Sequence, residues 1–173
     1  DAITHYDNLR ETDQILNKLH LDVIRTLNKK SDLQSRRADG MDIALLRIDK
    51  RNNTLQFSGA NRSVYILRDH EVIEKKGDRR PIGETSIAYL PFTSNEYKLE
   101  KDDVIYAFTD GIYDQIGEKT GKKFLRKNLI KLLVKISSLN LEEQKNIIEK
   151  TFLDYKGKEV QTDDVLITGL KIC

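Results

Sequence analysis

The sequence predicts a layered α+β domain in which strands are grouped together and helices lie before and after them. Two observations predict this class. Short apolar segments separated by turn residues follow one another between Asp42 and Phe108, which is typical of β-strands. Apolar residues at helical spacing occur in residues 12–27 and again after Asp110, ahead of a last strand-like segment. Neither an internal repeat nor a low-complexity linker interrupts the chain, so we expect a single domain, residues 1–173.

The composition is that of a globular protein. Of the 173 residues, 38% are hydrophobic and 34% are charged, and the chain contains only two prolines and nine glycines. A chain of this length can bury a core. The formal net charge is +2 with acids and bases interspersed, so the sequence lacks the concentrated basic face of a nucleic-acid-binding protein. We therefore expect no nucleic-acid partner.

The cysteine usage and the chain ends indicate a cytoplasmic location. The single cysteine, Cys173, is the last residue, so an internal disulfide is impossible and a reducing compartment fits. No apolar run approaches the ~20 residues that a membrane-spanning helix needs, so we expect no direct membrane insertion by this segment. The N-terminal residues form neither a signal peptide nor a start methionine, which predicts a piece of a longer protein that could itself be membrane-attached.

The first half of the chain predicts one helix followed by strands. An amphipathic helix is expected over Thr12–Leu27. Strands are then expected at residues 42–48, 54–58, 64–68 and 71–75, and their short turns favour an antiparallel meander. Strands at residues 96–99 and 104–108, joined by the turn "EKDD", should resume the sheet. Residues 76–94 contain glycine and proline at irregular spacing, which predicts a long surface loop.

The second half returns to helical spacing. A helix is expected over residues 124–136. A second helix should begin at Asn140, because Glu143 three residues later completes a capping box, and should end near Gly157. The last strand is expected over Val165–Ile172.

Two pairs of polar residues border apolar strands. Asp110-Gly111 directly follows the strand that ends at Phe108, and Asp163-Asp164 directly precedes the last strand. Taken alone, each pair is typical of a solvated turn. An uncompensated carboxylate at the rim of a buried sheet is costly, however, and a divalent cation removes that cost. Ligand sets made only of oxygen favour Mg²⁺ or Mn²⁺, so these acids are candidate metal ligands.

Three other kinds of site find no support. The histidines at positions 5, 20 and 70 have no zinc-ligand spacing. No serine stands in a Gly-x-Ser-x-Gly elbow, so a serine-histidine triad is unsupported. The segment "DGIYDQIGEKTG" lacks the alternating acids and the final glutamate of a calcium-binding EF-hand loop.

The order of four segments carries a family resemblance. "DGMDIALLRIDKRNNTLQFSGANRSVYILR" comes first, then "GDRRPIG", then "YAFTDGIYDQIG", and two predicted helices lead to "QTDDVLITGLKI". From Thr12 onward the chain resembles the metal-dependent protein phosphatases, the PPM or type 2C family, and more closely their bacterial SpoIIE-like branch. The resemblance implies an α-β-β-α sandwich of two mainly antiparallel sheets flanked by helices. It also implies hydrolysis of phosphoserine or phosphothreonine in proteins at a binuclear Mn²⁺ or Mg²⁺ centre.

The resemblance assigns residues to that centre. Asp110 and Asp163 match family positions that ligate metal, and they would therefore be the catalytic pair here. Asp164, and the backbone at Gly111, would act beside them or through an outer water. The loop containing Arg62 should border the substrate.

The chain departs from the family pattern in two places. The family site also needs an aspartate and a glycine carbonyl from N-terminal strands, which would precede Asp1, so the resemblance implies an N-terminally truncated domain that is inactive alone. Many relatives carry a histidine and then a proline after Ser-Gly-Ala, whereas this chain has Asn61 and Arg62. Arg62 could contact phosphate or could be an exposed loop arginine.

Two functions remain open on the sequence. The first is the phosphatase output of a larger bacterial sensor protein, acting in signal transduction on a phosphoprotein such as an anti-sigma-factor antagonist, with a sensor domain upstream. The alternative is a regulatory or protein-interaction module that keeps the fold without turnover. The choice depends on whether the upstream metal aspartate is present in the parent protein.

Overall fold

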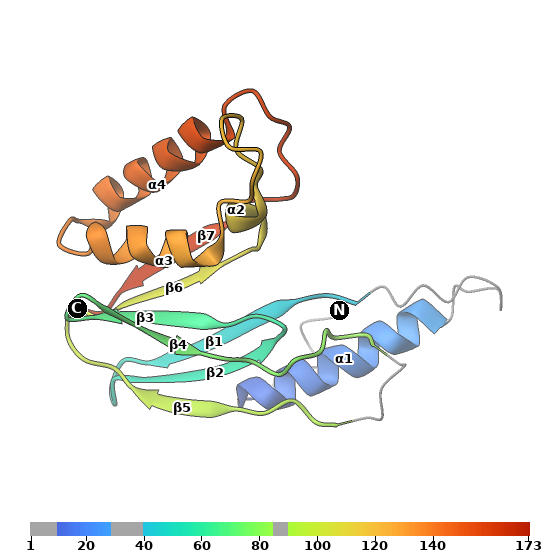
Figure 1. Ribbon diagram of the computed structural model, residues 1–173. Coiled ribbons are helices and arrows are strands. Elements are labelled where there is room, and N and C mark those ends of the chain that lie inside the picture. The colour runs from blue at the N-terminus through green and yellow to red at the C-terminus, as the bar shows by residue number, and fades with distance from the viewer. Residues whose placement is uncertain (1–9, 29–39, 85–89) are drawn as a thin grey trace. The chain divides into compact units, whose positions relative to one another are not determined.

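The structure, a computed structural model, describes residues 10–28, 40–84 and 90–173. In this part of the chain the elements, shown in Figure 1, are α1 (Thr12–Asn28), β1 (Ile43–Asp49), β2 (Thr54–Ala60), β3 (Val64–Arg68), β4 (Glu71–Lys75), β5 (Asn95–Lys98), β6 (Val104–Phe108), α2 (Gly111–Asp114), α3 (Arg126–Lys135), α4 (Leu141–Lys156) and β7 (Ile167–Lys171). The chain divides into two compact units. Unit 1 runs to Ser63 and includes Lys76–Leu99, and unit 2 comprises Val64–Lys75 and Glu100–Cys173.

Unit 1 is an antiparallel sheet with the order β1-β2-β5, and α1 packs on it (Figure 1). In β2 the side chains alternate between the two faces of the sheet, so that Ala60 faces α1. The apolar stripe of α1 buries Leu16 in the same cluster. That core contains buried Leu16, Ala60, Ile82 and Phe92, with Leu19, Val23, Ile43 and Leu45 partly buried against it.

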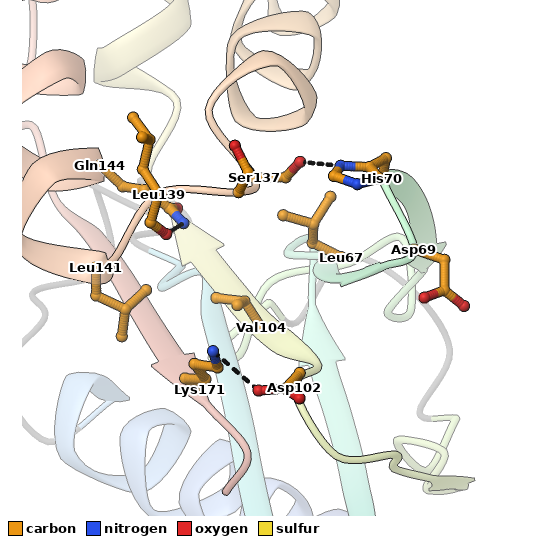
Figure 2. A pocket seen from close by; sticks show the side chains of 11 residues that line it. Leu67, Asp69, His70, Asp102, Val104, Ser137, Leu139, Leu141, Gln144 and Lys171 are labelled. Carbon is orange, nitrogen blue, oxygen red and sulfur yellow. Dashed lines mark hydrogen bonds and ion pairs between the residues drawn. The ribbon is translucent and has the colours of Figure 1, made fainter.

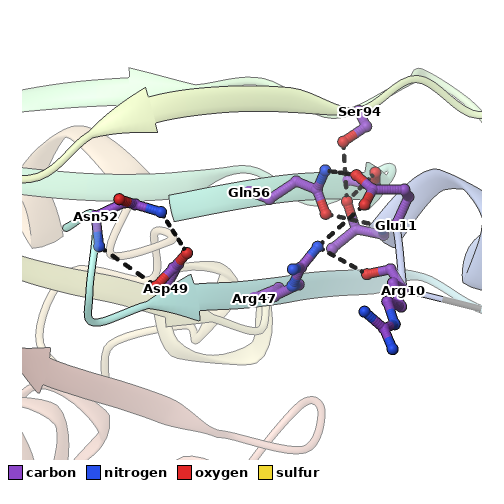
Figure 3. Close-up of polar contacts among 9 residues, drawn as sticks. Arg10, Glu11, Arg47, Asp49, Asn52, Gln56 and Ser94 are labelled. Atoms are coloured by element: carbon purple, nitrogen blue, oxygen red, sulfur yellow. Dashed lines mark hydrogen bonds and ion pairs between the residues drawn. The ribbon is translucent and has the colours of Figure 1, made fainter. Parts of the chain in front are cut away.

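Polar contacts fix the start of α1 on the same sheet (Figure 3). The Thr12 hydroxyl lies 2.8 Å from the Ser58 hydroxyl, and the Thr12 backbone N–H donates to Gln56 Oε1 over 3.1 Å. Arg47 donates to Glu11 over 3.1 Å, and Gln56 also donates to Glu11. These bonds satisfy groups that the first turn of a helix otherwise leaves open to water.

The segment expected to be a surface loop, residues 76–94, is in part buried. Ile82 and Phe92 are 0% and 2% exposed, and Ile82 exchanges two backbone hydrogen bonds with Met41. The Gly83 N–H donates to His20 Nδ1 over 3.0 Å, which ties the segment to α1. Burial and the charge of Arg80 lower the pKa of His20, which favours the neutral ring that accepts this bond. Residues 85–89 lie outside the described ranges.

Unit 2 is an antiparallel sheet with the order β4-β3-β6-β7, and α3 and α4 cover one face of it (Figure 1). The strand residues on that face alternate with residues on the other, as a period of two requires. The buried core that they form with the helices consists of Tyr65, Leu67, Val104, Tyr106, Phe108, Ile112, Leu129, Leu133, Ile136 and Ile148.

The predicted boundaries of α4 are confirmed. Asn140 caps the helix by accepting from the Glu143 N–H over 2.9 Å, and the Glu143 carboxylate accepts from the Asn140 N–H over 3.1 Å. Gly157 ends the helix with a positive φ of 55°. The other predicted elements are also present, shifted by at most two residues at either end, and α2 is an additional short helix.

The predicted meander is wrong between β2 and β3, which do not pair with each other. The expected pairing of the next two strands is wrong as well, because β5 pairs with β2 and β6 pairs with β3. Asn61 adopts a positive φ of 54° after β2, and the chain passes there from one sheet to the other. A Cβ on Gly59 would lie 2.3 Å from the Arg62 carbonyl oxygen, and one on Gly77 would lie 2.5 Å from it. Two glycines are therefore required where three chain segments meet.

The predicted fold class is confirmed, since the chain forms two antiparallel sheets accompanied by helices. Within residues 10–28, 40–84 and 90–173, none of the helices has the length and apolar character to cross a bilayer.

Candidate functional site

The candidate site begins where β6 ends. β6 lies between β3 and β7, and its residues Val104–Tyr106 are buried. The ring of Phe108 stacks on Tyr65 with centroids 4.6 Å apart, which holds the strand end in place. Asp110 follows as the N-cap of α2, and its carbonyl oxygen accepts the Tyr113 N–H over 2.9 Å. A buried central strand thus delivers Asp110 to the edge of the sheet.

The loop before β7 lies directly against this strand end. A Cβ on Gly111 would lie 2.4 Å from the Asp164 carbonyl oxygen and 3.1 Å from that of Asp163. Only glycine permits so close an approach of two backbones. The structure therefore brings Asp110-Gly111 next to Asp163-Asp164, as the sequence predicts for the two acidic pairs.

Thr109 fastens the two segments together. Its backbone N–H donates to the Leu166 carbonyl over 3.0 Å, and its hydroxyl accepts the Leu166 N–H over 2.9 Å. The same hydroxyl lies 2.9 Å from the Asp164 carbonyl oxygen, to which it donates. This residue was not identified from the sequence, although a threonine directly before the Asp-Gly pair is a residue type that often bonds to backbone groups.

Gln115 holds the same loop from its other end, and it too was missed. Its side chain is 0% exposed. Its amide donates to the Val160 carbonyl over 3.0 Å, and its Oε1 accepts the Thr162 N–H over 3.4 Å. A buried amide bonded in this way costs little, whereas one left unbonded costs much. The loop that carries Asp163 is thus anchored on both sides.

The carboxylates themselves are accessible. Asp110 is half-buried, and Asp163 and Asp164 are exposed. The Asp163 carboxylate accepts the Asp164 N–H over 2.7 Å. Within the described ranges neither Asp163 nor Asp164 forms an ion pair with a basic side chain. Negative charge without a basic neighbour is the electrostatic setting in which a cation binds.

The donor set fits a hard divalent cation only in part. All the side-chain donors brought together here are oxygens, which suits Mn²⁺ or Mg²⁺. Among the described residues, however, no three His, Cys, Asp or Glu side chains converge to hold an ion. Asp110 and Asp163 remain predicted ligands, and this part of the chain contains no complete cage.

The predicted substrate-edge residues belong to unit 1, whereas the acids belong to unit 2. Arg62 forms an ion pair with Asp42 over 3.2 Å, and the Asn61 side chain donates to the same carboxylate over 3.1 Å. A role for Asn61 or Arg62 at the phosphate stays a prediction.

A separate pocket of about 260 Å³ lies at the opposite end of β6 (Figure 2). Val104, the first residue of β6, lines it, whereas Asp110 follows the last. In Figure 2 the His70 ring points toward Ser137, with which it is hydrogen-bonded, and Lys171 pairs with Asp102 over 2.9 Å. Asp110, Asp163 and Asp164 are not among the residues that line this pocket, so the pocket is not the acidic site.

The comparisons with known proteins match both the sequence and the fold. The family model of stage II sporulation protein E, SpoIIE, matches residues 6–172. No curated protein sequence gives a significant match.

Among solved structures, the SiaA-PP2C domain of Pseudomonas aeruginosa aligns with a TM-score of 0.83 and 27% identity. The alignment covers 98% of this chain and 64% of the SiaA domain, so the chain spans less than two thirds of that structure. The phosphatase domain of SpoIIE from Bacillus subtilis aligns with a TM-score of 0.56 and 16% identity, covering 94% of this chain and 74% of that one. The serine/threonine phosphatase PstP of Mycobacterium tuberculosis aligns with a TM-score of 0.60 and 15% identity, covering 99% and 78%. The last two likenesses show the fold alone.

Proposed function

We propose, because this chain belongs to the SpoIIE family, that it is the major part of a metal-dependent protein serine/threonine phosphatase domain. The proposed reaction is hydrolysis of phosphoserine or phosphothreonine in a protein. One observation carries it: the Gly111 backbone touches the Asp163-Asp164 backbone, so Asp110-Gly111 and an acidic pair more than fifty positions later in the sequence meet at one edge of a sheet.

Each residue of this edge has a proposed role. Asp110 and Asp163 would hold Mn²⁺ or Mg²⁺, with two ions in a complete site. When bound, these ions lower the pKa of a water molecule and offset the charge of the phosphoryl group. Asp164 would orient the site through a water, and Thr109 would keep the two acidic segments at a fixed separation through its bonds to Asp164 and Leu166.

Other proteins support the choice of metal. A structure of the PstP catalytic domain contains two manganese ions. We infer the same kind of centre here from the oxygen-only donor set and from the family. Because the family site needs a further aspartate, we expect the 173-residue chain by itself to be inactive and to bind Mn²⁺ weakly.

The experiment measures Mn²⁺-dependent hydrolysis of a phosphoserine peptide by the full-length protein. Asp110→Asn and Asp163→Asn run beside the parent, with circular dichroism to verify the fold. We expect each variant to lose turnover while remaining folded. Turnover that persists in either variant, or that needs no divalent cation, contradicts the proposal.

The second candidate is a regulatory module that keeps the fold without turnover. The observation that favours it is the incomplete set of converging acidic side chains within residues 10–28, 40–84 and 90–173. A folded full-length protein that binds Mn²⁺ but hydrolyses no phosphopeptide would establish it. The proposed setting is common to both candidates: a bacterial signalling protein, with a sensor or regulatory segment and a phosphorylated partner such as an anti-sigma-factor antagonist.

A further inference from the structure

Helix α3 presents three lysines in one line. Lys127, Lys131 and Lys135 follow one another at intervals of four residues, and all three are exposed. Side chains at this spacing lie on one face of a helix, about 6 Å apart and over about 12 Å in total. We call these three residues the α3 lysine stripe. The buried residues Leu129 and Leu133 lie on the other side of the helix, so the stripe faces away from the core.

The surrounding sequence supplies no compensating charge. From Lys119 to Leu141 the chain contains seven basic residues and no aspartate or glutamate. Within the described ranges Lys123 pairs with Asp114 and Arg126 pairs with Glu74, whereas no ion pair involves the stripe. The stripe is therefore a concentrated positive line on a protein whose net charge is only +2.

At the start of α3 this charge does not serve the stability of the helix. Basic residues in the first turn oppose the helix dipole, and α3 places both Arg126 and Lys127 there with no acid. Its N-cap residue, Leu125, makes no side-chain capping bond. Helix α4 begins in the opposite way, with two acids in its first turn and a capping box, although both helices carry a lysine in the last turn. The two helices cover the same face of one sheet, so their shared position does not explain why the first turn of α3 is basic and that of α4 is acidic.

The stripe begins beside the acidic site. The Leu125 N–H donates to the Tyr113 carbonyl over 2.8 Å, and the Phe124 N–H donates to the Gln115 carbonyl over 2.9 Å. Tyr113 lies in α2, the helix that Asp110 caps. The two residues before α3 are thus bonded to α2 and to Gln115 directly after it, and the first lysine of the stripe follows two residues after Leu125.

We propose that the α3 lysine stripe docks an acidic segment of the phosphoprotein substrate, next to the residue that is dephosphorylated. This inference rests on the proposed phosphatase function and names the substrate class. Carboxylates at intervals of four residues on a helix, or at alternate residues of a strand, have the spacing of about 6–7 Å that matches the three ammonium groups. The fixed spacing of the three lysines is the feature that favours a protein segment here, because a polybasic membrane contact needs only a cluster of about four to eight basic residues in any order.

Binding is tested without turnover. Fluorescence anisotropy would follow the full-length protein with two labelled, unphosphorylated peptides, one with Glu at every fourth position and one with Gln in place of each Glu. The test variant is Lys127→Glu/Lys131→Glu/Lys135→Glu. The matched control is Lys145→Glu/Lys150→Glu/Lys158→Glu, three exposed lysines on and just after α4 that have acidic sequence neighbours.

We expect the Glu peptide to bind the parent protein and the control about equally, and the stripe variant about tenfold more weakly. The Gln peptide should not distinguish the three proteins, and added salt should weaken only the Glu peptide. Equal losses in the stripe variant and the control would overturn the proposal, as would a parent protein that does not prefer the Glu peptide. Stripe-dependent binding to phosphatidylserine vesicles, without any peptide preference, would assign the stripe to a membrane instead.

Kinetics then separates docking from catalysis. For an acid-flanked phosphoserine peptide, the stripe variant should raise KM about tenfold with little change in kcat. Turnover of p-nitrophenyl phosphate, which carries no acidic flank, should be unchanged. If the parent protein hydrolyses neither compound, the phosphatase proposal fails, while the anisotropy result still decides whether the stripe binds acidic segments. An equal loss on both compounds would show that the stripe acts on the site and not on docking.

Discussion

The chain uses the same three residues, Asp-Asp-Val, to enter two neighbouring strands, and the structure treats them in opposite ways. Asp102-Asp103 precedes β6, and Asp163-Asp164 precedes the segment that leads into β7. At the β6 entry, Asp103 is 1% exposed and accepts two hydrogen bonds from Arg68, over 2.8 and 2.6 Å. In the β7 loop both acids are exposed, and within the described part of the chain neither has a basic partner.

The difference comes from one distant side chain. Arg68 lies at the end of β3, and the pairing of β3 with β6 brings it beside Asp103. The Glu100 N–H donates to the same carboxylate over 2.8 Å, so the buried charge is fully bonded. In the β7 loop the backbone carbonyls of Asp163 and Asp164 lie against Gly111, and the Asp163 carboxylate accepts the Asp164 N–H. An acidic pair is thus structural where a base reaches it and is open to a cation where none does.

The largest expected effect tests the structural pair. Asp103→Asn places a neutral amide beside the Arg68 guanidinium, which keeps the exposed Glu100 as an ionic partner. Removing one partner of a buried ion pair costs about 3–5 kcal/mol of unfolding free energy, and the remaining pair with Glu100 places the expected cost at the lower end of that range. Asp110→Asn should leave the unfolding free energy unchanged or raise it, because it relieves repulsion among carboxylates. Urea denaturation of both variants measures the contrast. Equal stability of the two variants would end the distinction between the two sites.

The next effect concerns the approach of the two backbones. Gly111→Ala introduces a Cβ that would lie 2.4 Å from the Asp164 carbonyl oxygen, so the loop must move. Such overpacking costs about 1–3 kcal/mol, and a shift of about 1 Å in the acidic residues lowers turnover about 100-fold. Gly121→Ala is the control for turnover, because a Cβ there contacts nothing within 4 Å, while the positive φ of 62° gives this variant a stability cost of about 1–2 kcal/mol. Full turnover in Gly111→Ala would mean that the approach does not set the geometry of the site.

A smaller effect is expected at the hydroxyl that fastens the loop. Thr109→Val keeps the shape of the side chain but removes its bonds to Asp164 and Leu166, which costs about 1–2 kcal/mol. Thr109→Ser keeps the hydroxyl and should recover most of the stability and the Mn²⁺ affinity. Calorimetric titration of Mn²⁺ into the full-length variants shows whether Thr109 affects metal binding in addition to stability. A valine variant with the affinity of the parent would make Thr109 a purely structural residue.

The smallest effect is expected at Asp102, the exposed acid of the Asp102-Asp103 pair before β6. The hydrogen bond and charge of Lys171 hold the pKa of Asp102 below its ordinary value. A lowered pKa stabilises the fold above the ordinary pKa, and this stabilisation is lost as the pH falls through the lowered value. Both side chains are exposed, so solvent screening keeps the contribution small. In Lys171→Gln, an NMR titration should show the pKa of Asp102 rising toward its ordinary value with little change in melting temperature. A pKa that stays low would point to another cause.

Local sequence signals predict the elements well and the long-range partners poorly. The capping box at Asn140 and Glu143 was readable because both of its members lie within one turn of helix. The switch between sheets after β2 was not, because the positive φ of Asn61 depends on close packing among Gly59, Arg62 and Gly77. The burial of Ile82 and Phe92 was hidden for the same reason, since glycine and proline around them are typical of surface loops.

The residues of the candidate site also fall into those that local sequence predicts and those that it does not. Asp110 and Asp163 were predicted from their position at strand ends and from the resemblance, and the structure brings their segments together. Gln115 was not predicted, because nothing in its neighbourhood indicates that its amide bonds to residues 160 and 162. Contacts between residues far apart in the sequence leave no local pattern to read.

The division of the chain also has a consequence for how the molecule assembles during synthesis. The β3–β4 hairpin, Val64–Lys75, interrupts unit 1, yet its sheet partner β6 is made about thirty residues later. Unit 1 has all of its residues once Leu99 has been made, whereas unit 2 then consists of the hairpin alone and still lacks Glu100–Cys173. We therefore expect slow folding with a high relative contact order, and a nascent hairpin whose β3 edge stays unpaired until Val104 and the residues after it emerge.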